Sequence, residues 1–135
     1  MSPDVLQPLA FCKCAVAAFI GILFLQSGID KVVDFRGNLA WLEGHFAKSP
    51  LRGQVKPMLA VVTLLEVAAG ALAGAGAVQV ALSGSAQLAT WGAQVAAATI
   101  VMLFFGQRVA KDYAGAATLV PYFILCVGAV LLMGR

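Results

Sequence analysis

One long apolar run, residues 58–82, limits what this chain can fold into more than any other stretch. At a rise of 1.5 Å per residue, a helix of that length crosses a hydrocarbon core of about 30 Å. Its single ionisable residue is Glu66, nine residues after Pro57 and about 13 Å into the helix. A carboxylate at that depth must be covered by other helices or hold its proton. The sequence therefore predicts a membrane protein in which Glu66 is enclosed.

The rest of the chain has the same character. Hydrophobic residues make up 61% of it and charged residues only 11%, where a soluble domain carries about a quarter. We therefore expect one membrane domain, residues 1–135, in contact with the lipid bilayer. The net charge of +3 does not indicate a nucleic-acid partner, because the basic residues lie near the ends of apolar runs and there set orientation.

Four apolar runs predict an all-α fold, a bundle of four transmembrane helices at about residues 9–29, 58–82, 88–106 and 113–133. Pro121 is expected to kink the fourth helix, because it lacks a backbone donor. Small residues at helical spacing favour close approach of the second and third helices. These small residues are Gly70, Ala73, Gly74 and Ala77, then Ala93 and Ala97.

Between the first two runs, residues 35–48 form a polar segment with one apolar stripe. The stripe recurs at steps of three and four: Val32, Phe35, Leu39, Leu42 and Phe46. This spacing predicts an amphipathic helix. Two placements fit it, an interfacial helix at headgroup level or an ordered segment whose apolar side packs on the bundle.

Basic residues predict the orientation in the membrane. One side has Lys13 and Arg135, and the other has Lys31, Arg36, Lys48, Arg52, Lys56, Arg108 and Lys111. The positive-inside rule then places the connections between helices 1–2 and 3–4 in the cytoplasm and both termini outside, in a bacterial-type inner membrane.

Glu66 is the first candidate for chemistry. Tyr122 follows Tyr113 by nine residues, so it should lie level with Glu66, and we expect a hydrogen bond between them. Without a basic side chain expected at that depth, Glu66 should often be protonated. It then serves either as a proton relay or ligand contact, or as a polar tie between helices.

A second candidate is a group of polar residues at the predicted cytoplasmic helix ends. Its members are Gln26, Asp30, Lys31 and Asp34 near the first helix, and Gln107, Arg108, Lys111 and Asp112 before the fourth. Ion pairs of Asp30 or Asp34 with Arg108 or Lys111 would make this group a structural clasp. The alternative is a site for a lipid headgroup, a quinone or a partner.

Resident cofactors are not expected. Cys12, Cys14 and Cys126 provide neither a disulfide framework nor a complete zinc site. His45 is the only histidine, which excludes a bis-histidine haem within the chain, and we expect it to be a polar residue at the interface. A metal site is not predicted.

Three motifs together resemble the DoxX/DoxD-like family of small four-helix membrane proteins. They are FLQSGIDKVVDF at 24–35, LEVAAGAL at 65–72 and KDYAGA at 111–116. Two positions depart from the family pattern: Ala17 replaces an arginine in helix 1, and Gln107 replaces a histidine before helix 4. The resemblance implies association with membrane redox systems, since relatives accompany thiosulfate:quinone oxidoreductases, quinol oxidases and oxidative-stress assemblies.

With no complete catalytic or cofactor set in the chain, the resemblance implies an accessory, non-catalytic subunit of a quinone-linked electron-transfer complex, with other membrane subunits as partners. The alternative is a stand-alone quinone-reactive oxidoreductase component with Glu66 as proton relay. A quinone or lipid would contact candidates drawn from both groups: Glu66, Tyr122, Gln26, Lys31, Arg108 and Lys111.

Overall fold

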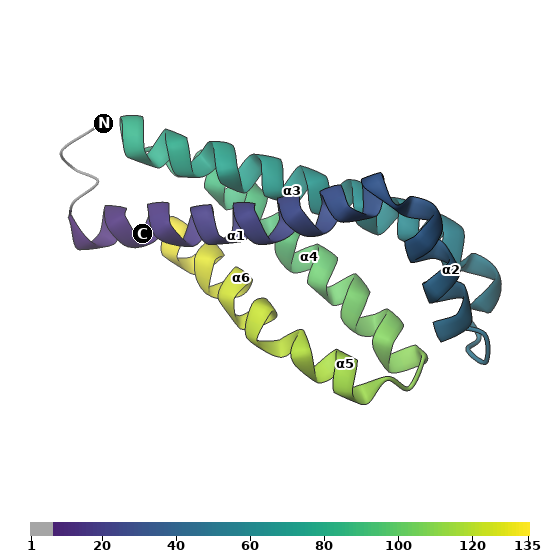
Figure 1. Cartoon of the computed structure of the whole chain (residues 1–135). Coiled ribbons are helices and arrows are strands. Elements are labelled where there is room, and N and C mark those ends of the chain that lie inside the picture. The colour runs from purple at the N-terminus through teal and green to yellow at the C-terminus, as the bar shows by residue number, and fades with distance from the viewer. Residues whose placement is uncertain (1–6) are drawn as a thin grey trace.

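The structure, a computed structural model, describes residues 7–135, and all of its regular elements are helices (Figure 1). In chain order they are α1 (Pro8–Val33), α2 (Phe35–His45), the 3-10 turn η2 (Arg52–Gln54), α3 (Val55–Ser83), α4 (Gln87–Val109), α5 (Tyr113–Thr118) and α6 (Val120–Met133). The predicted domain of residues 1–135 is therefore described from residue 7 onward.

Four stretches are long and apolar enough to cross a membrane: Pro8–Val33, Arg52–Ser83, Gln87–Val109 and Tyr113–Met133. The prediction of four transmembrane helices is confirmed at this level. The fourth stretch is interrupted at Leu119, which separates α5 from α6 two residues before Pro121. A break in the predicted place is explained by the proline ring and its missing backbone donor.

α1 and α3 lie side by side, and α4 and the α5–α6 segment run obliquely to them (Figure 1). α1 packs along α3, α4 also packs on α3 and touches α1, and α6 packs mainly on α4. The beginning of α1, the turn from α3 to α4 and the end of α6 lie at one end of the bundle. Gly84 makes that turn with φ 77°, a left-handed conformation that suits glycine. α2 and the α4–α5 connection lie at the opposite end.

Small residues bring α3 close to both of its neighbours. A Cβ on Gly70 would lie 2.5 Å from the Leu25 nitrogen in α1, and one on Gly92 would lie 2.5 Å from the Ala73 nitrogen in α3. Gly76 and Ala89 touch in the same way. The predicted close approach of the second and third helices is therefore present, and α1 shares in it. Such contacts are how helices associate where lipid removes the hydrophobic driving force.

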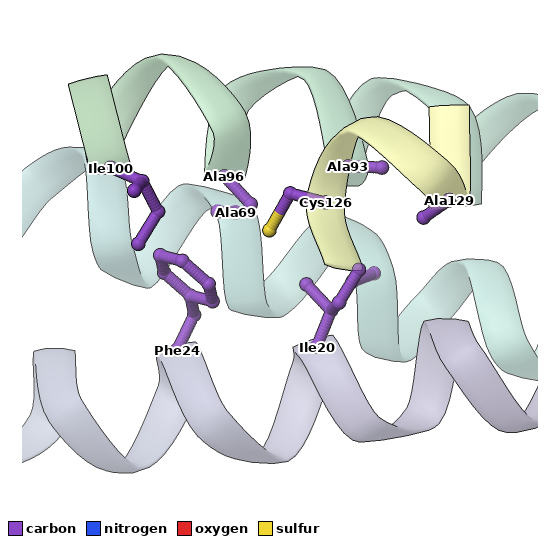
Figure 2. Packing of buried hydrophobic residues seen from close by; sticks show 9 residues of the cluster. Ile20, Phe24, Ala69, Ala93, Ala96, Ile100, Cys126 and Ala129 are labelled. Atoms are coloured by element: carbon purple, nitrogen blue, oxygen red, sulfur yellow. The ribbon is translucent and has the colours of Figure 1, made fainter. Parts of the chain in front are cut away.

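The core lies between α1, α3, α4 and α6 (Figure 2). Ile20 and Phe24 reach from α1 toward Cys126 of α6, and small residues of α3 and α4 fill the space around them. The buried members are Ile20, Phe24, Ala69, Ala73, Ala93, Ala96, Ile100, Cys126 and Ala129. This core packs α6 against α1 and α4.

The polar segment between the first two spans forms helix α2, with its stripe turned inward. Phe35, Leu39 and Leu42 are partly buried and Phe46 is buried, whereas Val32 is exposed. The amphipathic helix is therefore present with most of its stripe partly covered, and its position relative to the membrane interface stays a prediction.

Candidate functional site

The most enclosed charged group is Glu66, whose side chain is 3% exposed and forms an ion pair with Lys31. Lys31 Nζ of α1 donates to Glu66 Oε2 of α3 at 3.1 Å and to Ser27 Oγ at 2.8 Å. A third contact, with the Ser27 carbonyl oxygen, is long at 3.5 Å. The carboxylate is thus neutralised by a cation from the neighbouring helix, and that cation is fixed by a serine one turn earlier.

The axial register of α1 against α3 brings the two charges together. Gly21 lies against Gly74, Leu25 packs on Gly70, and Gly28 lies against Val67. Lys31 follows Gly28 by three residues and so lies on the same face of α1, next to Glu66. The absence of a side chain at Gly28 allows this approach, because a Cβ there would lie 3.0 Å from the Val67 nitrogen.

This arrangement corrects the prediction for Glu66. No hydrogen bond joins Glu66 to Tyr122, which is 36% exposed on α6, a helix that packs mainly on α4. Equal depth was not sufficient, because α6 packs on α4 and α1 and not on α3, the helix that carries Glu66. The expectation that no basic side chain reaches Glu66 is also wrong, and with it the reason for expecting a protonated carboxyl.

An apolar pocket of about 140 Å³ lies beside the ion pair. Its walls come from α2, the first turns of α3 and the last turns of α4, and Lys31 borders it. The lining residues are Lys31, Leu42, Phe46, Val55, Met58, Leu59, Val62, Met102, Leu103, Gly106 and Gln107. A second hollow of about 260 Å³ between α4 and the α5–α6 segment has only apolar lining residues. The first pocket alone places a charged side chain against an apolar space.

A polar contact closes the outer edge of this pocket. His45, at the end of α2, has Nε2 3.1 Å from Gln107 Oε1 and 3.5 Å from Asp112 Oδ2. The His45 ring also stacks on Trp41, with 4.9 Å between ring centroids. His45 was expected to be only an interfacial polar residue, but it connects α2 to the α4–α5 connection.

The clasp predicted at these helix ends forms with different partners. Among residues 7–135, neither Asp30 nor Asp34 pairs with Arg108 or Lys111. Asp34 instead caps α2 by accepting from the Gly37 nitrogen. A sequence can place charges at one end of a bundle, but it does not show which of them cap their own helices.

The remaining candidates from this group also have local roles or lie on the surface. Asp112 caps α5 by accepting from the Gly115 nitrogen at 2.9 Å. The Arg108 guanidinium lies 4.5 Å from the centroid of the Tyr113 ring. Gln26 and Lys111 are exposed. Of the six candidates for ligand contact, the structure therefore brings Glu66 and Lys31 together at the pocket.

The sequence analysis missed two features of the site: the glycine face of α1 that brings Lys31 to Glu66, and the contacts of His45. The sequence contains a usable signal for the first. Gly21 and Gly28 are seven residues apart, which marks one small-residue face of α1, and Lys31 continues that face. The contact of His45 with Gln107 and Asp112 had no such signal, because it joins the end of α2 to the end of α4 and the residues after it, whose relative positions depend on the whole bundle. Within the described chain, no group of three or more metal-ligating side chains occurs.

A comparison with known protein families finds no match, and neither do comparisons with curated proteins or with solved structures. The resemblance to the DoxX/DoxD-like family therefore rests on the three sequence motifs.

Proposed function

We propose that this protein is an accessory subunit of a quinone-linked membrane redox complex and that it binds the head of a quinone in the pocket beside Lys31. The observation that carries the proposal is that the half-buried Lys31, paired with the buried Glu66, borders an apolar space. A mostly apolar pocket with a few fixed polar groups is the usual form of a small-molecule site.

The size of the pocket favours a single ring. An engineered cavity of about 150 Å³ lined by aliphatic and aromatic side chains binds benzene, and this pocket measures about 140 Å³. A six-membered ring fits that space, whereas a phospholipid headgroup with two acyl chains is far larger. The flexible side chains of Met58 and Met102 line the pocket and can adapt to ring substituents.

Lys31 supplies the polar contact for such a ring. Its ammonium has three protons, and the two short bonds to Ser27 Oγ and Glu66 Oε2 use two of them. The third proton is held only by a long contact and can be donated to a ring carbonyl oxygen. Glu66 then acts by holding the ammonium in place, so it is a positioning residue in this proposal.

The placement in the membrane is part of the proposal. Seven basic residues near α2 and the α4–α5 connection favour a cytoplasmic location for the pocket end, with both termini outside a bacterial-type inner membrane. α2 then lies at the cytoplasmic interface, where the exposed Trp41 and the neighbouring basic side chains suit the headgroup region. A quinone would enter this site from the bilayer.

Binding of a short-tailed benzoquinone to the purified protein tests the proposal. Because hydrogen bonds to charged groups contribute about 1.5–3 kcal/mol, K31M should weaken binding by at least about tenfold. K13M, which removes a lysine at the opposite end of α1, is the matched control and should bind as wild type does. Equal affinity of K31M and wild type would reject the quinone site.

Association with a complex has its own test. Purification in mild detergent should recover further membrane subunits in fixed stoichiometry. A lone chain that nevertheless supports quinone turnover, and loses it in E66Q, would favour the stand-alone enzyme with Glu66 as relay. A lone chain without turnover would contradict both functions.

A further inference from the structure

α2 forms part of the pocket wall but is weakly attached to the bundle. None of the residues Phe35–His45 is buried. Leu42 of α2 and Phe46, directly after it, nevertheless line the pocket. Phe46 is 7% exposed, and its ring tip lies close to Gly106 of α4. This helix therefore covers a space while burying little of its own surface, as expected for an element of low local stability.

The junction between α1 and α2 has the form of a hinge. Asp34 alone separates the two helices, with φ −126° and ψ 55°, outside the helical region. Its carboxylate accepts from the Gly37 nitrogen, and its carbonyl oxygen accepts from the Asn38 side chain. Because α2 has its own N-terminal cap, it can turn about Asp34 without losing its first hydrogen bonds.

The other end of α2 is held by the His45 contacts. The 3.1 Å distance to Gln107 joins it to the last turn of α4, and the 3.5 Å distance to Asp112 joins it to the α4–α5 connection. Gln107 also lines the pocket, so the fastening lies at the pocket's edge. Releasing these contacts would remove the side-chain hydrogen bonds that hold the end of α2 next to Leu42 and Phe46, and would leave the apolar packing of Phe46 near Gly106 to hold it.

We propose that α2 is a movable cover over part of the Lys31 pocket, hinged at Asp34 and held in place by the contacts of His45 with Gln107 and Asp112. The cover would regulate access to the proposed quinone site. Only this regulatory role rests on the proposed function. Its motion is a property of this chain with or without a ligand.

Cysteine modification measures the motion directly. Val62 lines the pocket, is 8% exposed and is close to cysteine in size, so V62C places a thiol under the cover. The modification rate of this thiol by a polar methanethiosulfonate is followed in the purified full-length protein by peptide mass spectrometry. The native Cys12, exposed on the first turns of α1, is the internal reference.

Adding H45A to V62C should accelerate modification of residue 62 about fivefold, the factor expected for loss of one net hydrogen bond from a closed state. Q107M keeps the length of the side chain and the fold of α2, so it should accelerate the same thiol even if H45A fails to fold. G44A is the matched control, because a Cβ there meets open space, and it should leave the rate unchanged.

Unchanged rates in both H45A and Q107M would overturn the proposal. Acceleration of Cys12 to the same extent would also overturn it, because that result reports general loosening and not a cover. The readout needs no quinone. A chain that opens as described yet binds no benzoquinone would therefore refute the proposed function and leave the cover intact.

Discussion

The two ends of this bundle are built in opposite ways, although α3 runs through both. In the tight half, defined by Gly21, Gly70, Gly76 and Gly92, helices meet backbone to backbone. In the pocket half, a cavity of about 140 Å³ lined by long side chains lies between α2, α3 and α4, and the ion pair of Lys31 with Glu66 joins α1 to α3 beside it.

The difference shows how a small membrane protein can combine close helix packing at one end with a cavity at the other. Close packing in the tight half fixes the register of α1 on α3 and so decides which side chains meet further along. That register carries a lysine to the level of a carboxylate that lipid would not tolerate. The pocket half can then carry a cavity and a cover because stability is supplied elsewhere. Glu66 lies at the boundary, one turn before Gly70.

Removing the Lys31 cation from the pocket half should give the largest loss of stability. K31M leaves the Glu66 carboxylate enclosed and without its partner, which costs about 3 kcal/mol in systems of this kind. Unfolding in mixed detergent micelles measures the change. E66Q should cost less, because the amide oxygen still accepts from Lys31 and the ammonium has some access to solvent. If E66Q were the more destabilising variant, the account of the pair would be wrong.

Overpacking the tight half should be next in size. G92L places a branched side chain where even a Cβ would lie 2.5 Å from the Ala73 nitrogen, so we expect about 2–3 kcal/mol of destabilisation. The matched control is G128A on α6, where a Cβ meets nothing within 4 Å. The control should change the unfolding free energy by less than about 0.5 kcal/mol. If G92L and G128A had the same unfolding free energy, the tight half would not be closely packed at Gly92 as described.

The smallest effect separates the two roles of Asp112. D112A removes both the cap of α5 and the carboxylate near His45, and capping losses are typically about 1 kcal/mol. D112S retains a capping oxygen, so most of that cost should return while the contact with His45 is lost. Thermal unfolding of the two variants makes the comparison. Equal stability would show that Asp112 does not act as a cap.

The sequence was sufficient to predict the four spanning helices. It was not sufficient to predict which side chains contact one another between them. Apolar length and composition predicted four spanning helices, and glycine spacing predicted close contacts of α3. Glu66 was correctly expected to be enclosed, because its cost in lipid depends on depth alone. Lys31 was placed at the membrane interface, and its contact with Glu66 was not predicted. Counting residues along one helix does not give its axial register against a neighbouring helix.

The error for Tyr122 has a different cause. Its depth was deduced from its distance along the fourth span, but the face it presents depends on how α6 packs against α4 and α1. Rotation about a helix axis is set by side-chain packing among several helices. No periodic signal separates the faces of a segment as uniformly apolar as residues 120–133.

Lys31 and Glu66 stabilise each other inside the bundle if the ion pair forms as described. A double-mutant cycle with K31M, E66M and K31M/E66M in the full chain measures this most directly. We predict a coupling free energy of at least about 1 kcal/mol, with the double variant more stable than the sum of the single losses implies. Single effects that add to within about 0.5 kcal/mol would contradict the ion pair, and with it the site built around it.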